Sequence, residues 1–219
     1  IVGGGVLGLE AAWSLRQLGL NITILENAPR LLPRQLDQEG SRILEEAVSE
    51  AGIKIVRGAS LAEIMGDSEV KGIKLSDGQV IDAGMVLFSI GVTPNAELAK
   101  EAGINVNRGI IVNDMMKTSA DNVFAAGDVA EYEGTVSGLW PQALEQGRIA
   151  GANAVGDKQK YKPATPATYL DAFGITVVAI GDVGNTPDTV YRTVEVNDPA
   201  NRTYKKYYFV DGTIKGAVL

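Results

Sequence analysis

Glycine spacing near the start of the chain constrains the fold more than any other feature. The chain begins IVGGGVLGLEAAWSLRQLGLNITILE, in which Gly3, Gly5 and Gly8 have the spacing G-x-G-x-x-G. Apolar, strand-forming residues precede this loop and recur at 21–25, and a helical pattern lies between them. We therefore predict a strand, a glycine turn, a helix and a second, parallel strand, joined by a right-handed crossover.

The three glycines differ in what each one permits. Gly3 allows a tight turn, Gly5 lets the backbone approach a pyrophosphate, and Gly8 lets the helix pack closely on the strand. The N-terminus of the following helix offers unpaired N–H groups and the positive end of its dipole to phosphate. This segment therefore predicts a dinucleotide-binding site.

Glu26 sets the expected choice of dinucleotide. It closes the second strand at the distance where an acidic side chain meets the ribose hydroxyls. Because a carboxylate there repels a 2′-phosphate, we expect NAD rather than NADP. Arg30 and Arg34 would weaken this preference if they faced the cofactor, and they are equally compatible with solvated loop arginines.

Composition excludes several other functions. The 219 residues include neither Cys nor His, which rules out disulfides, zinc clusters, thiol nucleophiles and imidazole bases among them. We expect no metal site and no catalytic side chain, so the chemistry must come from a bound cofactor. The net charge of −7 argues against nucleic acid, and no apolar run is long enough to span a bilayer. We expect a cytoplasmic protein.

The first predicted domain covers residues 1–90 and is a Rossmann-like α/β unit with a parallel sheet. Its first helix is expected to bury one face, formed by Leu7, Ala11, Leu15 and Leu18. Asp37 is expected to cap a second helix, and the sequence SDG at 76–78 marks a hairpin within a small β-meander. The run MVLFSIG at 85–91 is expected to be a buried strand that completes the domain.

Two further domains are expected to follow. Residues 91–157 begin at the Pro/Asn/Gly crossing GVTPNAEL and contain a helix-like segment, LEQGRIAGANAVG. Residues 158–219 begin within the polar segment DKQKYKPATPAT, are rich in β patterns and stop inside an apolar run. In this last domain, Gly181 and Asp182 are expected to end a strand and begin a turn.

A second motif lies in the middle domain. The segment TSADNVFAAGDVAEYE combines Thr118, an apolar run that we expect to form a strand, and the pair Gly127-Asp128. Together with the glycine loop and the crossing FSIGVTPN at Gly91, it resembles the FAD-dependent pyridine nucleotide-disulfide oxidoreductase superfamily. Within that superfamily, LPRQLD and GLWPQALEQGRIAGANAVG look most like the NADH:rubredoxin reductases and the flavin module of assimilatory nitrite reductases.

The resemblance implies roles for individual residues. Asp128 would accept hydrogen bonds from the ribityl chain of FAD, and Gly127 would let the strand end pass close to the cofactor. Gly91 would take the tight position at the junction between NAD and FAD domains. Glu10 would lie near the nicotinamide and flavin rings, or would be only a polar residue on the first helix. Three residues would bring backbone beside the isoalloxazine ring: Trp140, Pro141 and Ala143.

Members of the superfamily also contain a segment that is not found in this sequence. In the superfamily, FAD is held mainly by another G-x-G-x-x-G unit that precedes the NAD domain. This chain contains one such fingerprint, and Gly3 follows only two residues of strand. We therefore expect an upstream portion, an incomplete C-terminal domain, and a fragment that binds NADH without tight binding of FAD.

The function implied by the resemblance is that of an NADH-dependent FAD flavoprotein reductase. Hydride would pass from NADH to the flavin, and electrons would move on to rubredoxin, an iron–sulfur centre or a nitrite-reducing centre. One alternative is an NADH oxidase or disulfide reductase of the same superfamily. Another is a flavin-free NAD-sensing or interaction module. The C-terminal domain would supply a homodimer interface.

Overall fold

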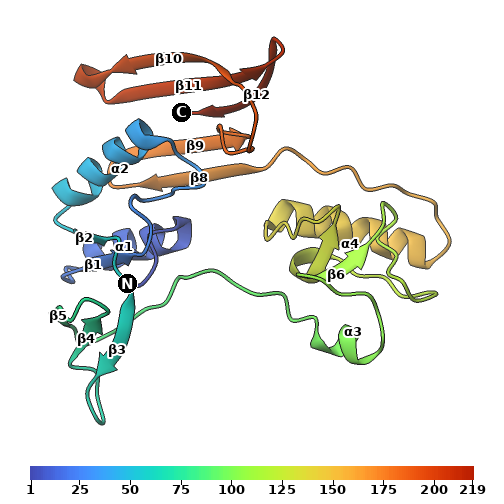
Figure 1. The fold of residues 1–219 in the computed structure, drawn as a ribbon, viewed down its shortest axis with the longest axis horizontal. Helices are drawn as coiled ribbons and strands as arrows, with labels where there is room; N and C mark the ends of the chain where they lie inside the picture. Colours follow the sequence, from blue (N-terminus) through green and yellow to red (C-terminus); the bar gives the residue numbers. More distant parts are fainter. The chain divides into compact units, whose positions relative to one another are not determined.

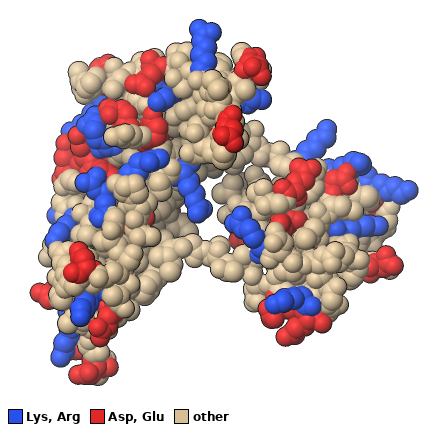
Figure 2. Space-filling view, viewed as in Figure 1, with Lys and Arg blue, Asp and Glu red and all other residues tan.

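The computed structural model describes residues 1–219 and confirms a mixed α/β fold. The chain forms two compact units, one made of residues 1–90 and 167–219 and the other of residues 91–166. Figure 1 labels the helices and strands of both units. No helix is long and apolar enough to cross a membrane. On the face drawn in Figure 2, acidic and basic side chains are interspersed.

The glycine loop belongs to a parallel sheet in the first unit. Val2 forms parallel bridges to Leu25 on one side and to Phe88 on the other. The helix and the strand that follow the loop have the predicted order, and this strand also pairs in parallel with a further strand. These elements are α1 (Val6–Gln17), β1 (Thr23–Glu26) and β2 (Lys54–Arg57).

Helix α2 (Gln38–Glu50) lies between β1 and β2 in the chain and begins at Asp37, as predicted. The Gly40 amide donates to Oδ1 of Asp37 at 3.0 Å, which satisfies one of the unpaired donors of the first turn. Leu44 and Val48 are completely buried on the inner face of this helix.

The buried face of α1 differs from the predicted one. Leu7 is 72% exposed and Leu18 is 77% exposed, whereas Leu9 and Ala12 are completely buried. The difference arises because Gly8 is itself buried against the loop. Successive residues of a helix point about 100° apart, so burying Gly8, Leu9 and Ala12 turns Leu7 toward solvent.

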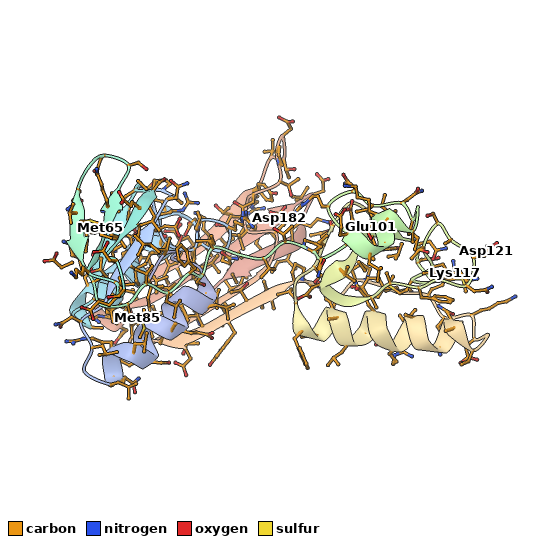
Figure 3. All side chains as sticks on the ribbon, turned by 90° about the horizontal axis from the view of Figure 1, so that it is seen from below. Met65, Met85, Glu101, Lys117, Asp121 and Asp182 are labelled. Carbon is orange, nitrogen blue, oxygen red and sulfur yellow. The ribbon has the colours of Figure 1, made fainter.

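The run at 85–91 is not the buried strand that the sequence predicts. It forms a single bridge, between Phe88 and Val2, and Met85 and Ile90 are each 70% exposed. Met85 is labelled in Figure 3. The pairing is short because its partner, the strand before the glycine loop, is itself only a bridge at Val2.

An antiparallel meander follows β2, as predicted. The SDG sequence at 76–78 forms the turn between its last two strands, and Gly78 has a positive φ of 90°. Ile73 and Leu75 pack with Leu25 in a small core beneath the parallel sheet. The three strands are β3 (Leu61–Met65), β4 (Gly72–Leu75) and β5 (Val80–Asp82).

The C-terminal residues form a five-stranded antiparallel sheet with the order β10-β11-β12-β9-β8. One face of this sheet packs on α1 and α2, so that Leu170 and Val218 share one hydrophobic core with Leu9 and Leu44. Segments far apart in the sequence therefore fold as one unit. The strands are β8 (Ala167–Ala172), β9 (Ile175–Gly181), β10 (Arg192–Asp198), β11 (Thr203–Val210) and β12 (Thr213–Val218), with a short helix η2 (Pro199–Asn201).

The pair Gly181-Asp182 ends β9 and begins a turn, as predicted. Asp182, labelled in Figure 3, accepts hydrogen bonds from the backbone amides of Gly184 and Asn185 at 3.1 and 3.0 Å. Its other oxygen accepts from Thr186 Oγ1 at 2.6 Å and from the Tyr191 hydroxyl. Both oxygens of this carboxylate therefore accept hydrogen bonds from the loop that follows it, and they stabilise that loop.

The second unit contains a parallel strand pair and the predicted long helix. Its core gathers residues from the strand pair, the loops and the helix, including Met116 and Ile149, both completely buried. The elements are α3 (Glu97–Glu101), β6 (Ile110–Val112), η1 (Gly127–Val129), β7 (Ala130–Tyr132) and α4 (Trp140–Ala154). The apolar run before Gly127, expected as a strand, forms only a bridge from Phe124 to Lys117.

Candidate functional site

Backbone atoms leave no room for a side chain at two of the three predicted glycine positions. Gly3 has a φ of 110°, and a Cβ there would lie 2.1 Å from the carbonyl oxygen of Ser89. A Cβ at Gly8 would lie 2.1 Å from the carbonyl oxygen of Gly3. The loop is therefore packed against Ser89 at Gly3, and helix α1 rests on the loop at Gly8, so that only glycine fits at either position.

Gly5 is different, because nothing lies within 4 Å of a Cβ placed there. It is the N-cap residue of α1, and no side chain caps the helix. The first amides of a helix lack partners within the helix, and they carry partial positive charge. Open space beside such amides fits the pyrophosphate of a dinucleotide.

The Glu26 carboxylate lies at the end of β1 and joins two loops. Its Oε2 accepts a hydrogen bond from the Gly4 amide at 2.7 Å, and its Oε1 accepts from the Ala28 amide at 2.7 Å. The G-x-G-x-x-G spacing gives no role to Gly4, although the run of three glycines was the available signal. A Cβ at Gly4 would lie 2.5 Å from a methyl carbon of Leu31, a completely buried side chain that would have to move to admit it.

The Arg30 side chain forms hydrogen bonds within the loop that follows Glu26. Its Nη2 donates to the carbonyl oxygens of Pro33 at 3.0 Å and Leu36 at 3.3 Å. Arg34 is exposed, and its carbonyl oxygen accepts from Nδ2 of Asn185 at 2.7 Å. Arg30 therefore holds the loop in shape, whereas the Arg34 side chain lies at the surface.

Glu10 lies on the exposed side of α1, three residues after the exposed Leu7. Its backbone carbonyl accepts a hydrogen bond from Ser14 Oγ at 2.9 Å. The first unit thus contains five of the predicted site residues: Gly3, Gly5, Gly8, Glu10 and Glu26.

The remaining predicted residues lie in the second unit. Gly91 opens this unit with a φ of 90° and is exposed. Gly127 has a φ of 77°, and a Cβ there would lie 3.5 Å from the Cβ of Ala143. Asp128 is exposed beside it. The structure therefore brings Gly127 and Ala143 together.

Helix α4 presents its N-terminal end at the surface. Trp140 is 77% exposed, and Pro141 occupies the first turn, where its missing N–H costs nothing. Leu139 provides no side-chain cap. The buried side chain of Gln146 accepts a hydrogen bond from the Gly127 amide at 2.8 Å. Gln146 was not among the predicted site residues, and its signal in the sequence was an amide side chain on the inner face of a helix.

Comparisons with known proteins give the family. The model for pyridine nucleotide-disulphide oxidoreductases matches residues 1–147. The chain belongs to this family. A second model, the C-terminal domain of rubredoxin NAD+ reductase, matches residues 166–219. These matches confirm the resemblance and identify this oxidoreductase chain as a member of a family of NAD(P)H-dependent FAD enzymes.

Individual relatives agree with the family. The oxidoreductase chain is 36% identical over 220 residues to a nitrite reductase (NAD(P)H) of Bacillus subtilis, covering 100% of this chain and 27% of that protein. It is 35% identical over 198 residues to an NADH-rubredoxin oxidoreductase of Clostridium acetobutylicum, covering 89% of this chain and 48% of that protein.

A solved structure has the same fold. A ferredoxin reductase from Rhodopseudomonas palustris superposes with a TM-score of 0.84 at 28% identity, over 99% of this chain and 54% of that one. The oxidoreductase chain thus spans between about a quarter and about half of the length of these proteins.

Proposed function

We propose that residues 1–219 carry the NADH-binding domain and the second FAD-binding segment of an NADH-dependent flavoprotein reductase. The observation that carries this proposal is the glycine loop, which is closed by backbone at Gly3 and Gly8 and open at Gly5. In this proposal the NAD domain is 1–90, the flavin segment is 91–157 and the C-terminal domain is 158–219. Bound NADH and FAD supply the hydride transfer, and the protein binds and orients them.

Several contacts of the first unit favour NADH over NADPH. The Glu26 carboxylate stands between two backbone amides at the end of β1, where the ribose is expected. A 2′-phosphate would be repelled by this negative charge. Nη2 of Arg30 is not free to bind such a phosphate, because it donates to two carbonyl oxygens of its own loop.

The second unit supplies the proposed flavin contacts. Gly127 turns the chain through a left-handed conformation, and its amide is fixed by Gln146. The exposed Asp128 carboxylate next to this turn is available to accept hydrogen bonds from ribityl hydroxyls. The N-terminus of α4, marked by Trp140 and Pro141, would favour negative charge on the reduced flavin.

The proposed electron acceptor is a small redox protein or a metal centre. The names of the relatives, nitrite reductase and NADH-rubredoxin oxidoreductase, support acceptors of this kind. The alternatives within the family are oxygen and a disulfide. Steady-state assays of the whole reductase with rubredoxin, nitrite, oxygen and a disulfide in turn distinguish these acceptors by their rates.

We also propose that the outer face of the C-terminal sheet forms a homodimer interface. Four apolar side chains on this face are 47–60% exposed: Tyr169, Val194, Val196 and Ile214. A sheet face open to water is ordinarily polar, and an apolar patch marks an interaction site. Light scattering should report a dimer, and Val196→Lys should convert it to a monomer.

Titration calorimetry tests the cofactor assignment. We expect NADH to bind more tightly than NADPH, and FAD to bind weakly because the other part of its pocket lies outside these residues. Glu26→Ala should weaken NADH binding by about 1–3 kcal/mol through loss of hydrogen bonds to the carboxylate. Glu45→Ala removes a partly buried carboxylate that pairs with Arg57, and serves as the matched control.

Three results would contradict the assignment. An unchanged NADH affinity in Glu26→Ala would show that Glu26 does not contact the ribose. Tight FAD uptake by residues 1–219 would show that the flavin pocket is complete within them. NADH binding without flavin absorbance in the whole protein would favour the flavin-free NAD-sensing module.

A further inference from the structure

Two hairpins of the C-terminal sheet have two-residue turns with different residues. Phe173 and Gly174 join β8 to β9, with φ values of 56° and 73°. Asp211 and Gly212 join β11 to β12, with φ values of 49° and 76°. Turns with two positive φ values favour Asn or Asp before Gly. The second turn follows this preference, and the first turn has an aromatic residue in a conformation that bulky residues rarely adopt.

The Phe173 side chain is also buried, although it lies at the tip of a hairpin. Only 7% of Phe173 is exposed, whereas Asp211 is exposed. The Phe173 ring meets the ring of Trp13 on α1 edge to face, with centroids 5.3 Å apart and an interplanar angle of 62°. The unfavourable turn residue therefore makes a contact with α1 that a preferred residue would not make.

The contact matters because α1 carries the glycine loop at its N-terminus. Trp13 lies one helical turn after Leu9, which is completely buried in the same core as Phe173. Gly8, the residue before Leu9, leaves no room for a side chain between α1 and the Gly3 carbonyl oxygen. A shift of α1 is thus passed directly to the loop, since close-packed contacts do not absorb it.

We propose that Phe173 is a positioning residue for NADH. It holds α1, and through α1 the glycine loop, in the geometry that binds the dinucleotide. This role rests on the NADH site proposed above. It gives the C-terminal sheet a part in cofactor binding without any contact to the cofactor, through a hairpin that packs on the first helix.

The variant Phe173→Asn separates the turn from the ring contact. It supplies the residue that the turn prefers and removes the aromatic ring. We expect the Kd for NADH to rise about three- to tenfold, the range in which residues remote from a ligand change its affinity. Hydrogen exchange of the α1 amides should accelerate, while exchange in the β3–β4–β5 meander should not change.

Two further variants control the result. Asp211→Asn changes the corresponding residue of the other hairpin, and we expect it to alter neither the Kd nor exchange in α1. Phe173→Tyr keeps the ring and should retain the wild-type Kd. If Phe173→Asn does not fold, Phe173→Leu replaces it, because leucine keeps an apolar side chain in the core without the ring.

An unchanged Kd in the variant without the ring overturns the proposal. So does an equal change in Asp211→Asn, which would show a general effect of the sheet on the unit. If the wild-type chain does not bind NADH, the proposed function fails instead. Exchange in α1 then still decides whether Phe173 holds this helix, because that measurement needs no cofactor.

Discussion

The two glycine motifs of this oxidoreductase chain are built in different ways. At Gly3 and Gly8, carbonyl oxygens occupy the space that a Cβ would need, 2.1 Å from its position. At Gly127 the nearest atom would be 3.5 Å away, an ordinary contact. The first motif is therefore shaped by close packing. The second depends on the left-handed backbone of Gly127 and on one hydrogen bond from its amide to Gln146.

The difference extends to the side chains of the two motifs. Glu26 has both carboxylate oxygens engaged by backbone amides. Asp128 and Trp140 are exposed, and the N-terminus of α4 has no side-chain cap. A preformed loop loses little entropy when it binds a ligand. We therefore expect the first motif to bind its dinucleotide as a rigid site, and the second to be ordered further by its ligand.

The largest expected effect comes from closing the space around the glycine loop. Gly8→Ala should destabilise the protein by about 3 kcal/mol, the upper end of the usual range for overpacking, because its Cβ meets a backbone oxygen. Gly5→Ala is the matched variant. It should change the free energy of unfolding by less than about 1 kcal/mol, since the site is open, and yet weaken NADH binding by about tenfold or more.

Urea unfolding and calorimetry measure these two quantities separately. If Gly5→Ala lowered stability as much as Gly8→Ala does, the contrast between a closed and an open position would be wrong. If it left the NADH affinity unchanged, the pyrophosphate would not lie at Gly5.

A smaller effect is expected where α2 meets the C-terminal sheet. Asp37 accepts hydrogen bonds from the Tyr204 hydroxyl at 2.6 Å and from Lys206 Nζ at 2.8 Å. Burial alone would raise the pKa of Asp37, but the hydrogen bonds from Lys206, Tyr204 and the Gly40 amide lower the pKa below its ordinary value of 3.8. A carboxyl group whose pKa is lowered by folding stabilises the folded state above that ordinary value.

The contribution of Asp37 is therefore lost as the pH falls from about 3.8 through the lower pKa of the folded state. Asp37→Asn keeps a good helix cap and removes the charge, so it should cost about 1.5–3 kcal/mol at neutral pH. Urea midpoints measured against pH check this. The curves of the wild type and of Asp37→Asn should converge in acid, and parallel curves would show that the charge of Asp37 does not stabilise the unit.

Local rules explain what the sequence predicted correctly. The glycine spacing, the Asp37 cap and the SDG turn each depend on a few neighbouring residues, and all three appear where expected. The buried face of α1 could not be predicted in this way. Leu7 fits a helical pattern as well as Leu9 does, and only the close approach at Gly8 decides which of them is buried.

Contacts between residues far apart in the chain could not be predicted from the sequence. Nothing in the local pattern shows that Phe173 packs on Trp13 or that Gln146 fixes the Gly127 amide. The same holds for the candidate site. Spacing predicted Glu26 at the end of a strand, but the hydrogen bond to Gly4 depends on how two loops meet in space.

The smallest effect is expected in helix α4, which follows the second motif in the chain. Gly147 lies inside α4, is exposed, and has nothing within 4 Å of a Cβ placed there. Gly147→Ala should therefore stabilise the second unit by about 0.5–1 kcal/mol, because alanine loses less backbone entropy in a helix. Gly151→Ala, one turn later with the same open surroundings, is the control and should act alike. A loss of stability at Gly147 alone would show that this side of α4 is covered in the folded protein, as Gly8 is covered in the first motif.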